Sequence, residues 1–286
     1  MKYRKYHALG NDYIVLRPAT FEIALSPDMV RLICHRNYGI GADGILYGPL
    51  DSAACDFGLR IFNPDGSEAE KSGNGLRIFA RSLYDEGLVD ERPFSVETRG
   101  GMVSCTVEKG GGSVTVAMGE VSFDSRRIPV AGEPREVLNE DICVGGKTFK
   151  FCAATVGNPH CVVLTEAPIA CAARRYGPLI EHDPRFPNRT NVQFMKVVDR
   201  GNIQVEIWER GAGYTLASGS SSTAAAAVAR RLGLCDAKIT VHMPGGALHI
   251  RLTDDFYATL TGPVTGVCAG VLLPDMIEGL SHPHPR

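Results

Sequence analysis

The chain of 286 residues repeats a series of short motifs, and this repetition limits its possible folds more than any other feature. Five landmarks recur in the same order, at offsets that differ by one residue at most from 146 (218 minus 72). The landmark pairs are Gly10-Asn11 with Gly157-Asn158, 59–62 with 205–208, Ser72-Gly73 with Ser218-Gly219, Gly87-Leu88 with Gly233-Leu234, and 96–101 with 241–246. Collinear repeats of this length indicate a duplicated structural unit.

Both halves show the same succession of elements. Each contains an early apolar strand (13–16 or 161–164), a later strand (57–62 or 203–208), and a polar loop that ends in Ser-Gly. A helix follows in each half, over 73–86 or 219–232, and Gly87 or Gly233 is placed to end it. Short alternating strands come next, over 94–98, 103–108 and 113–118 in the first half and over 239–243, 248–252 and 257–261 in the second. The sequence predicts an α/β (α+β) fold.

The predicted architecture consists of two pseudo-symmetric halves, each with strands arranged around one central helix. The alanine-rich segment 223–229 is small on all sides, as expected for a helix packed tightly inside its own half. The expected division is a first half over 1–120, to which a C-terminal strand can return, a connecting segment over 121–149 and a second half over 150–275. The connecting segment is rich in Pro and Gly, which is typical of a linker.

Composition argues against several classes of function. The formal net charge is −2 and the sequence has no basic tract, so nucleic-acid binding is not expected. No apolar run approaches the ~18 residues of a membrane-spanning helix, and the N-terminus lacks the apolar core of a signal peptide. The nine cysteines show no metal-binding spacing, and we expect buried, reduced thiols in a cytoplasmic protein without a metal site.

The segment 39–44 fits the pattern G-x-G-x-x-G, but its context is reversed for a dinucleotide site. It follows a helix-like stretch (27–35) and precedes a strand-like one (45–47), whereas a dinucleotide fingerprint follows a strand and opens a helix. The sequence therefore does not predict a nicotinamide cofactor.

The two helix starts are the strongest candidates for a binding site. Ser72-Gly73-Asn74-Gly75 and Ser218-Gly219-Ser220 place small residues where the first backbone N–H groups of a helix have no intrahelical acceptor. Such N–H groups, together with the helix dipole, favour an anion. We expect a ligand carboxylate at these positions, in a cleft that the two halves share.

Seven blocks then reveal a resemblance that spans about residues 5–270. HALGNDYIVL, YGIGADG, FNPDGSEAEKSGNGLR, VGNPHCV, TNVQF, ERGAGYTLASG and MPGG, in this order, resemble the diaminopimelate epimerase family. The resemblance implies two similar halves and a cofactor-free inversion of an amino-acid α-carbon. It also implies a small amino-acid substrate of the meso/LL dicarboxylic diamino class, a place in lysine and peptidoglycan precursor synthesis, and compatibility with a homodimer.

The resemblance further implies roles for individual residues. Asn11, Asn63, Asn158, Asn191 and Arg210 match the positions that hold the distal amino-carboxylate end of the substrate. Gly73-Asn74 and Gly219-Ser220 match the positions that bind the carboxylate beside the reacting carbon. Glu209 and His160 match polar groups near that carbon and the catalytic pair, although His160 alone is also consistent with a structural histidine and Glu209 with a surface ion pair.

The chain departs from the family at both catalytic positions, where Ser72 and Ser218 replace the two thiols that the family uses as base and acid. A cysteine thiol titrates near 8.5 and an alcohol near 15.7, so generating the base from serine costs roughly 10 kcal/mol more. Three explanations stay open: exchange of both catalytic cysteines, a natural branch with other chemistry or another amino acid, and a silent amino-acid-binding protein. Lys71 is an alternative base, or a lysine that points into solvent.

Overall fold

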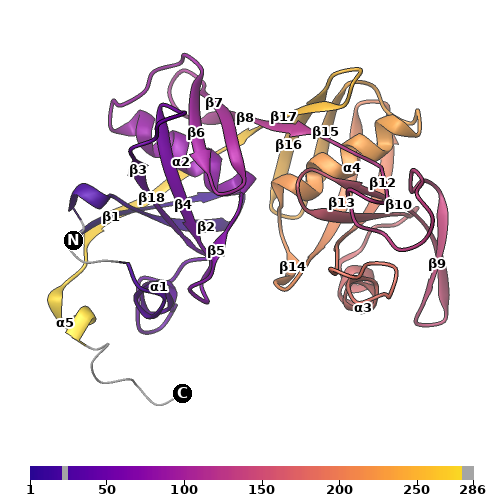
Figure 1. Ribbon diagram of the computed structural model, residues 1–286, viewed down its shortest axis with the longest axis horizontal. Helices are drawn as coiled ribbons and strands as arrows, with labels where there is room; N and C mark the ends of the chain where they lie inside the picture. Colours follow the sequence, from indigo (N-terminus) through magenta and orange to yellow (C-terminus); the bar gives the residue numbers. More distant parts are fainter. Residues whose placement is uncertain (21–24, 279–286) are drawn as a thin grey trace. The chain divides into compact units, whose positions relative to one another are not determined.

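The structure is a computed structural model that describes residues 1–20 and 25–278, and the chain forms two compact units (Figure 1). Unit 1 contains Met1–Val116 and the chain from Pro263 onward, and unit 2 contains Ala117–Gly262. The chain leaves unit 1 in β8 and returns in β17, and these two strands pair with each other. The C-terminal segment therefore belongs to unit 1, together with the N-terminus.

Unit 1 is built mainly from strands, with α2 as its longest helix. Its elements are β1 (Lys2–Ala8), β2 (Asn11–Leu16), the 3₁₀ turn η1 (Pro18–Thr20), α1 (Pro27–Cys34), β3 (Ile45–Leu50), β4 (Phe57–Phe62), β5 (Glu68–Ala69), α2 (Gly73–Asp85), β6 (Phe94–Thr98), β7 (Gly101–Val107), the start of β8 (Ser113–Glu120), β18 (Thr265–Val271) and α5 (Pro274–Glu278). The expected helix over 73–86 is confirmed to within one residue, and Gly87 follows its C-cap with φ +69°.

From β10 to β16, unit 2 repeats the order of strands and helices that unit 1 has from β1 to β7. Its elements are β9 (Glu140–Val144), β10 (Lys147–Thr155), β11 (Pro159–Leu164), α3 (Ala170–Glu181), β12 (Asn191–Asp199), β13 (Asn202–Glu209), β14 (Gly213–Thr215), α4 (Gly219–Arg231), β15 (Lys238–Met243), β16 (Gly246–Leu252) and β17 (Tyr257–Pro263). Helix α4 ends as expected, with Gly233 in the left-handed region at φ +71°.

The strand pairings repeat from one unit to the other, as expected for a duplication. In unit 1, β1–β2 is antiparallel, β2–β3 parallel, β3–β4 antiparallel, β4–β6 parallel and β6–β7 antiparallel. In unit 2, β10–β11, β11–β12, β12–β13, β13–β15 and β15–β16 repeat this succession. The pairing of β18 with β1 corresponds to that of β9 with β10, so the C-terminus supplies the outer strand of unit 1. The predicted fold of two repeated α/β halves is confirmed.

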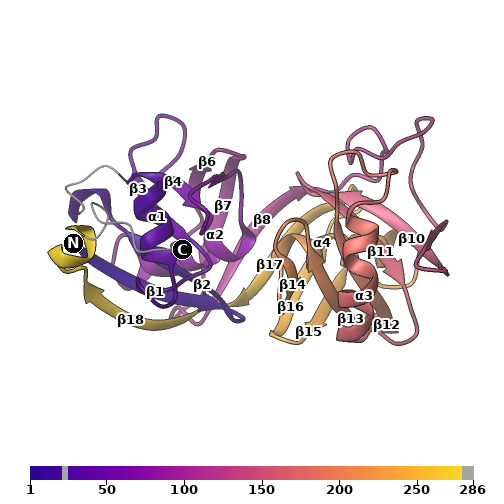
Figure 2. The same cartoon turned by 90° about the horizontal axis from the view of Figure 1, so that it is seen from below.

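Each central helix is enclosed by the strands of its own unit (Figure 1). Helix α4 contacts β10, β11, β12, β13, β15 and β16, and it is buried from Ser221 to Ala229. The run Ala224–Ala227 makes this possible, because methyl side chains let strands approach the helix axis from several directions. Helix α3 lies against β12 and β13 on the other side of these strands (Figure 2).

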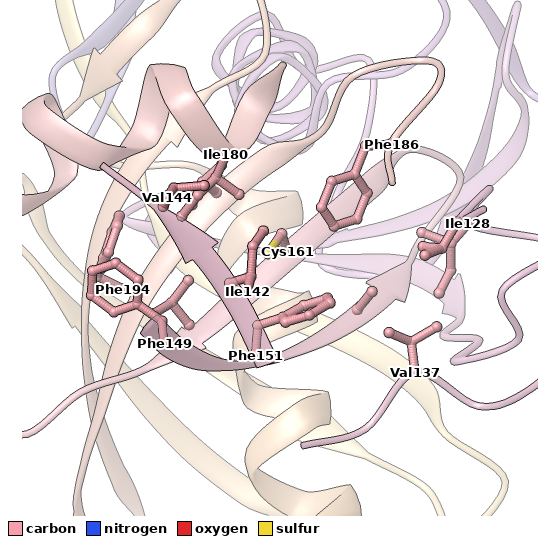
Figure 3. Packing of buried hydrophobic residues seen from close by; sticks show 14 of the residues in the cluster. Ile128, Val137, Ile142, Val144, Phe149, Phe151, Cys161, Ile180, Phe186 and Phe194 are labelled. Atoms are coloured by element: carbon pink, nitrogen blue, oxygen red, sulfur yellow. The ribbon is translucent and has the colours of Figure 1, made fainter. Parts of the chain in front are cut away.

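A cluster of aromatic and aliphatic side chains fills the space between α3 and the strands of unit 2 (Figure 3). Phe149, Phe151 and Phe194 form its centre, and Phe149 meets Phe194 edge-to-face with ring centroids 6.0 Å apart. Ile128, Val137 and Ile142 extend the same cluster. The segment 121–149, expected to be a linker, thus differs from that expectation, because its apolar side chains are buried in unit 2.

The cysteines partly match the prediction. The structure has all nine as free thiols, and five of them are buried. Cys143, Cys171 and Cys268 are exposed, which corrects the expectation of uniformly buried thiols. In the described part of the chain, no helix combines the length and apolar character needed to cross a membrane, and no group of three or more His, Cys, Asp or Glu side chains is placed to hold a metal ion.

Candidate active site

Ser72 is the N-cap of α2. Its backbone is extended (φ −140°, ψ 117°), and its Oγ accepts a hydrogen bond of 3.0 Å from the N–H of Gly75. A Cβ on Gly75 would lie 3.2 Å from Ser72 Cβ and 3.0 Å from Leu46 Cδ2, so the glycine keeps this turn compact. The N–H groups of Gly73 and Asn74 belong to the same first turn, where anions bind.

Asn74 connects the start of α2 to β2 through an ordered series of amides. Its Nδ2 donates to Asn11 Oδ1 at 2.9 Å, and Asn11 Nδ2 donates to Asp43 Oδ2 at 2.9 Å. From the other side, Arg77 donates to Asn74 Oδ1 at 2.9 Å. Because each amide has its donor and acceptor sides assigned in this way, the orientations of Asn11 and Asn74 are fixed.

Arg77 is a fully buried cation in the middle of α2. Its side chain is 0% exposed, and among the described residues its Nε and one terminal nitrogen have no hydrogen-bond partner. Burial lowers the pKa of the guanidinium from 12.5 to about 9. Sequence reasoning missed this residue, whose only signal is an arginine on the apolar face of a predicted helix.

In unit 2, a buried network joins β11 and β12 to the start of α4. His160 Nε2 lies 3.0 Å from Asn158 Oδ1, and Gln193 Nε2 lies 3.2 Å from His160 Nδ1 and 2.9 Å from Ser221 Oγ. Asn158 Nδ2 in turn donates to Ser220 Oγ at 3.5 Å. Gln193 was missed at the sequence level, although it lies within the quoted block TNVQF.

The contacts of His160 define its protonation state. Burial, and to a smaller extent the positive charge of Arg210, lower the pKa of the imidazole to about 3. The Gln193 amide donates to Nδ1, so the neutral ring carries its proton on Nε2 and donates it to Asn158. In this arrangement His160 orients Asn158, and its expected part in catalysis stays a prediction.

Arg210 and Asn191 meet at the end of β13. The backbone N–H of Arg210 donates to Asn191 Oδ1 at 3.0 Å, while Asn191 Nδ2 donates to the carbonyl of Pro159 at 2.8 Å. The loop after Glu209 is held by Glu181, which accepts from Trp208 Nε1 at 2.7 Å and from the N–H of Gly211 at 2.9 Å. Glu181, a buried carboxylate at the end of α3, is a third residue that sequence reasoning missed.

The two serines at the helix starts differ in their surroundings. Ser218 is buried at the N-cap of α4 but makes no side-chain cap bond, whereas Ser72 caps its helix. Asn63 follows β4 and donates through Nδ2 to Ser67 Oγ at 3.0 Å. Lys71 is partly buried, and burial lowers its pKa, so it does not simply point into solvent.

The structure thus gathers the predicted residues into two groups, one in each unit. Unit 1 brings together Ser72, Gly73, Asn74 and Asn11, and unit 2 brings together Asn158, His160, Asn191, Arg210 and Ser220. The amide oxygens, amide N–H groups and first-turn N–H groups of both sets suit a zwitterion that carries carboxylates.

The family model described as diaminopimelate epimerase matches residues 3–123 and 152–267. The chain is 61% identical over 272 residues to diaminopimelate epimerase 2 of Nostoc sp., covering 95% of each protein. It is 40% identical over 284 residues to a diaminopimelate epimerase of Desulfitobacterium hafniense, covering 97% of this chain and all of that one.

A similar fold is found in more distant proteins. The structure of a probable proline racemase from Agrobacterium radiobacter superposes with a TM-score of 0.71 at 16% identity, covering 96% of this chain and 93% of the other. At this identity the likeness concerns the fold alone. Each of the two ranges matched by the family model includes one helix start with serine at the N-cap position, Ser72 in the first and Ser218 in the second.

Proposed function

The chain belongs to the diaminopimelate epimerase family, and on this premise we propose that it interconverts LL- and meso-diaminopimelate by inverting one α-carbon. The reaction is an isomerisation and uses no cofactor. We assign substrate carboxylate binding to the first-turn N–H groups, which lie at Gly73-Asn74 in unit 1 and at Gly219-Ser220 in unit 2, because these groups have no intrahelical acceptor. The match of the family model to both halves is the observation that carries this proposal.

Amide and guanidinium side chains bind the distal amino-carboxylate end of the substrate. Arg210 supplies a charge-assisted bond to the carboxylate. Asn11, Asn63, Asn158 and Asn191 supply donors and acceptors for the amino and carboxylate groups together. The fixed orientations of Asn11, by Asn74 and Asp43, and of Asn158, by His160, support this assignment. Glu209, at the end of β13, is assigned to the amino group beside the reacting carbon.

Inversion requires a base that removes the α-proton and an acid that returns a proton to the opposite face. Ser72 and Ser218 occupy the two positions that perform these steps in the family. Membership of the family supports turnover. Because serine is a much weaker acid than cysteine, turnover also requires another group that lowers the free-energy cost of moving the proton. Placement in lysine and peptidoglycan precursor synthesis, the cytoplasm as location and assembly into a homodimer stay predictions.

Isothermal titration calorimetry with the LL and meso isomers tests the binding half of the proposal. We expect heat with both isomers and none with a monocarboxylic amino acid such as leucine, because the distal carboxylate then has no counterpart. Binding of the monocarboxylic amino acid without binding of either isomer would contradict the proposed substrate class.

A second function, amino-acid binding without turnover, is favoured by one observation: both acid–base positions are serine. Proton exchange separates the two functions. An epimerase incorporates deuterium from D₂O at the α-carbon of diaminopimelate, whereas a binding protein with the same affinity leaves that carbon protonated over hours. A third possibility, isomerisation of a double bond, would place deuterium at another carbon.

A further inference from the structure

Ser72 has a second hydroxyl beside it. The phenolic oxygen of Tyr13, on β2, lies 3.3 Å from Ser72 Oγ. Ser72 Oγ already accepts the N–H of Gly75, and one of the two hydroxyls donates to the other. A titratable phenol is therefore hydrogen-bonded to the serine that occupies an acid–base position of the family.

The position of the phenol is set by the surrounding fold. Tyr13 is 7% exposed, and its place on β2 is fixed by antiparallel pairing with Tyr6 on β1. Its ring packs over Gly44, where a Cβ would lie 2.6 Å from Tyr13 Cε1. The absence of a side chain on Gly44 therefore opens the path by which the Tyr13 hydroxyl reaches Ser72.

The duplicated half carries a different residue at the corresponding place. Gly10-Asn11 matches Gly157-Asn158, so Tyr13 corresponds to His160. The His160 ring is engaged with Asn158 and Gln193 and is held neutral by burial. The hydroxyl pair formed by Tyr13 and Ser72 is thus a feature of unit 1, and the two serines are not chemically equivalent.

A phenol makes proton transfer far easier than an alcohol does. Tyrosine titrates near 10 and an alcohol near 15.7, a gap of about 6 units, or roughly a factor of 10⁶ in the equilibrium population of the deprotonated form. A serine that exchanges its proton with a phenol does not have to hold the negative charge of an alkoxide.

We propose that Tyr13 is the acid–base group of unit 1 and that Ser72 Oγ relays the proton between Tyr13 and the substrate α-carbon. This inference rests on the proposed epimerase function. In the protonation step, Ser72 O–H gives its proton to the α-carbanion, whose electron pair forms the new C–H bond, and Tyr13 O–H replaces the proton on Ser72. The Tyr13 phenolate then regains a proton from water. In the opposite direction the phenolate takes the Ser72 proton while Ser72 takes the α-proton.

The test compares Tyr13→Phe with Tyr6→Phe as a matched control. Each change removes one hydroxyl from a buried tyrosine, and the two residues face each other on paired strands. The Tyr6 hydroxyl donates to Asp85 at 3.0 Å, so its hydrogen bond does not involve Ser72. Deuterium incorporation at the α-carbon of LL-diaminopimelate and dissociation constants by calorimetry are measured for both variants and the unaltered protein.

Tyr13→Phe should lower the exchange rate by about 10²-fold or more, the usual contribution of a general acid–base group, while the dissociation constant changes by less than about threefold. Tyr6→Phe should exchange like the unaltered protein. Adding Ser72→Cys to Tyr13→Phe should restore exchange, because a thiol needs no phenol to carry its charge. A structural role for the hydroxyl would not produce this rescue.

Tyr13→Phe that exchanges within about threefold of an active unaltered protein would overturn the relay and leave the epimerase function standing. No exchange by the unaltered protein would overturn both. If Tyr13→Phe does not fold, Ser72→Ala decides instead: the relay requires a loss of similar size, and full exchange by Ser72→Ala would overturn it.

Discussion

Replacing Arg77 by methionine should make the protein more stable at pH 7. Burial lowers the pKa of Arg77 from 12.5 to about 9, which corresponds to about 4–6 kcal/mol of folding free energy lost at pH 7. Methionine has a similar length and no charge to bury. Its introduction leaves Asn74 Oδ1 without the Arg77 donor, at about 1–3 kcal/mol. We therefore expect a net gain of about 1–5 kcal/mol in the free energy of unfolding at pH 7.

The same reasoning fixes the dependence on pH. Because the folded pKa lies below the ordinary value, the folded state favours the neutral guanidine, and the unaltered protein gains stability as pH rises from about 9 toward 12.5. At pH 10.5 this gain amounts to about 2 kcal/mol. The advantage of Arg77→Met should shrink by that amount between pH 7 and pH 10.5.

Urea unfolding followed by circular dichroism at both pH values measures the effect. Arg81→Met, one turn further along α2, is the control, because Arg81 pairs with Asp85 at 2.7 Å and is partly exposed. It should lose stability at pH 7, because the ion pair with Asp85 is removed. A loss of about 2 kcal/mol or more for Arg77→Met at pH 7 would refute the reasoning, since it would require partners that compensate the buried charge.

Three further predictions follow from the two groups of site residues. Arg210→Ala should weaken binding of diaminopimelate by about 1.5–3 kcal/mol in calorimetry, if Arg210 makes a charge-assisted bond; an unchanged affinity would remove Arg210 from the site. Changing Ser72 and Ser218 together to cysteine should raise the epimerisation rate strongly, as followed by chiral chromatography, because inversion needs both an acid and a base and a thiol serves as either more readily than an alcohol; a double variant that binds but does not turn over would contradict this. The pKa of His160 is lowered to about 3, so the free energy of unfolding should fall as pH drops from about 6.5 toward 3. The variant His160→Gln should lose less stability over this interval in urea titrations. An equal loss in both proteins would show that protonation of a group other than His160 causes it.

The duplication and the central helices could be predicted from sequence because they depend on local signals. Serine and glycine at the helix starts, Gly87 and Gly233 after the helix ends, and apolar spacing between them are sufficient to define α2 and α4. The repeat then transfers each element from one half to the other. The strand pattern followed for the same reason, because short alternating segments recur at a fixed distance.

The contacts that define the site depend on tertiary structure and were not predictable in the same way. Tyr13 and Ser72 are 59 residues apart, and Gln193 and His160 are 33 residues apart. Whether the side chains of each pair meet depends on strand register and, for Tyr13, on the space left by Gly44. Neither can be read from the neighbouring residues in the sequence. The segment 121–149 was expected to be a linker because its Pro and Gly residues indicate turns. Its apolar side chains pack against strands that come later in the chain, which the local sequence does not indicate.

The most direct test of the central claim is the fate of the α-hydrogen of diaminopimelate in D₂O. The purified protein is incubated with the LL isomer and no added cofactor, and the substrate is followed by NMR and by chiral chromatography. We predict deuterium at the α-carbon together with appearance of the meso isomer. Tight binding of the LL isomer with a fully protonated α-carbon and no meso isomer would contradict the claim that this chain, with Ser72 and Ser218, is an epimerase.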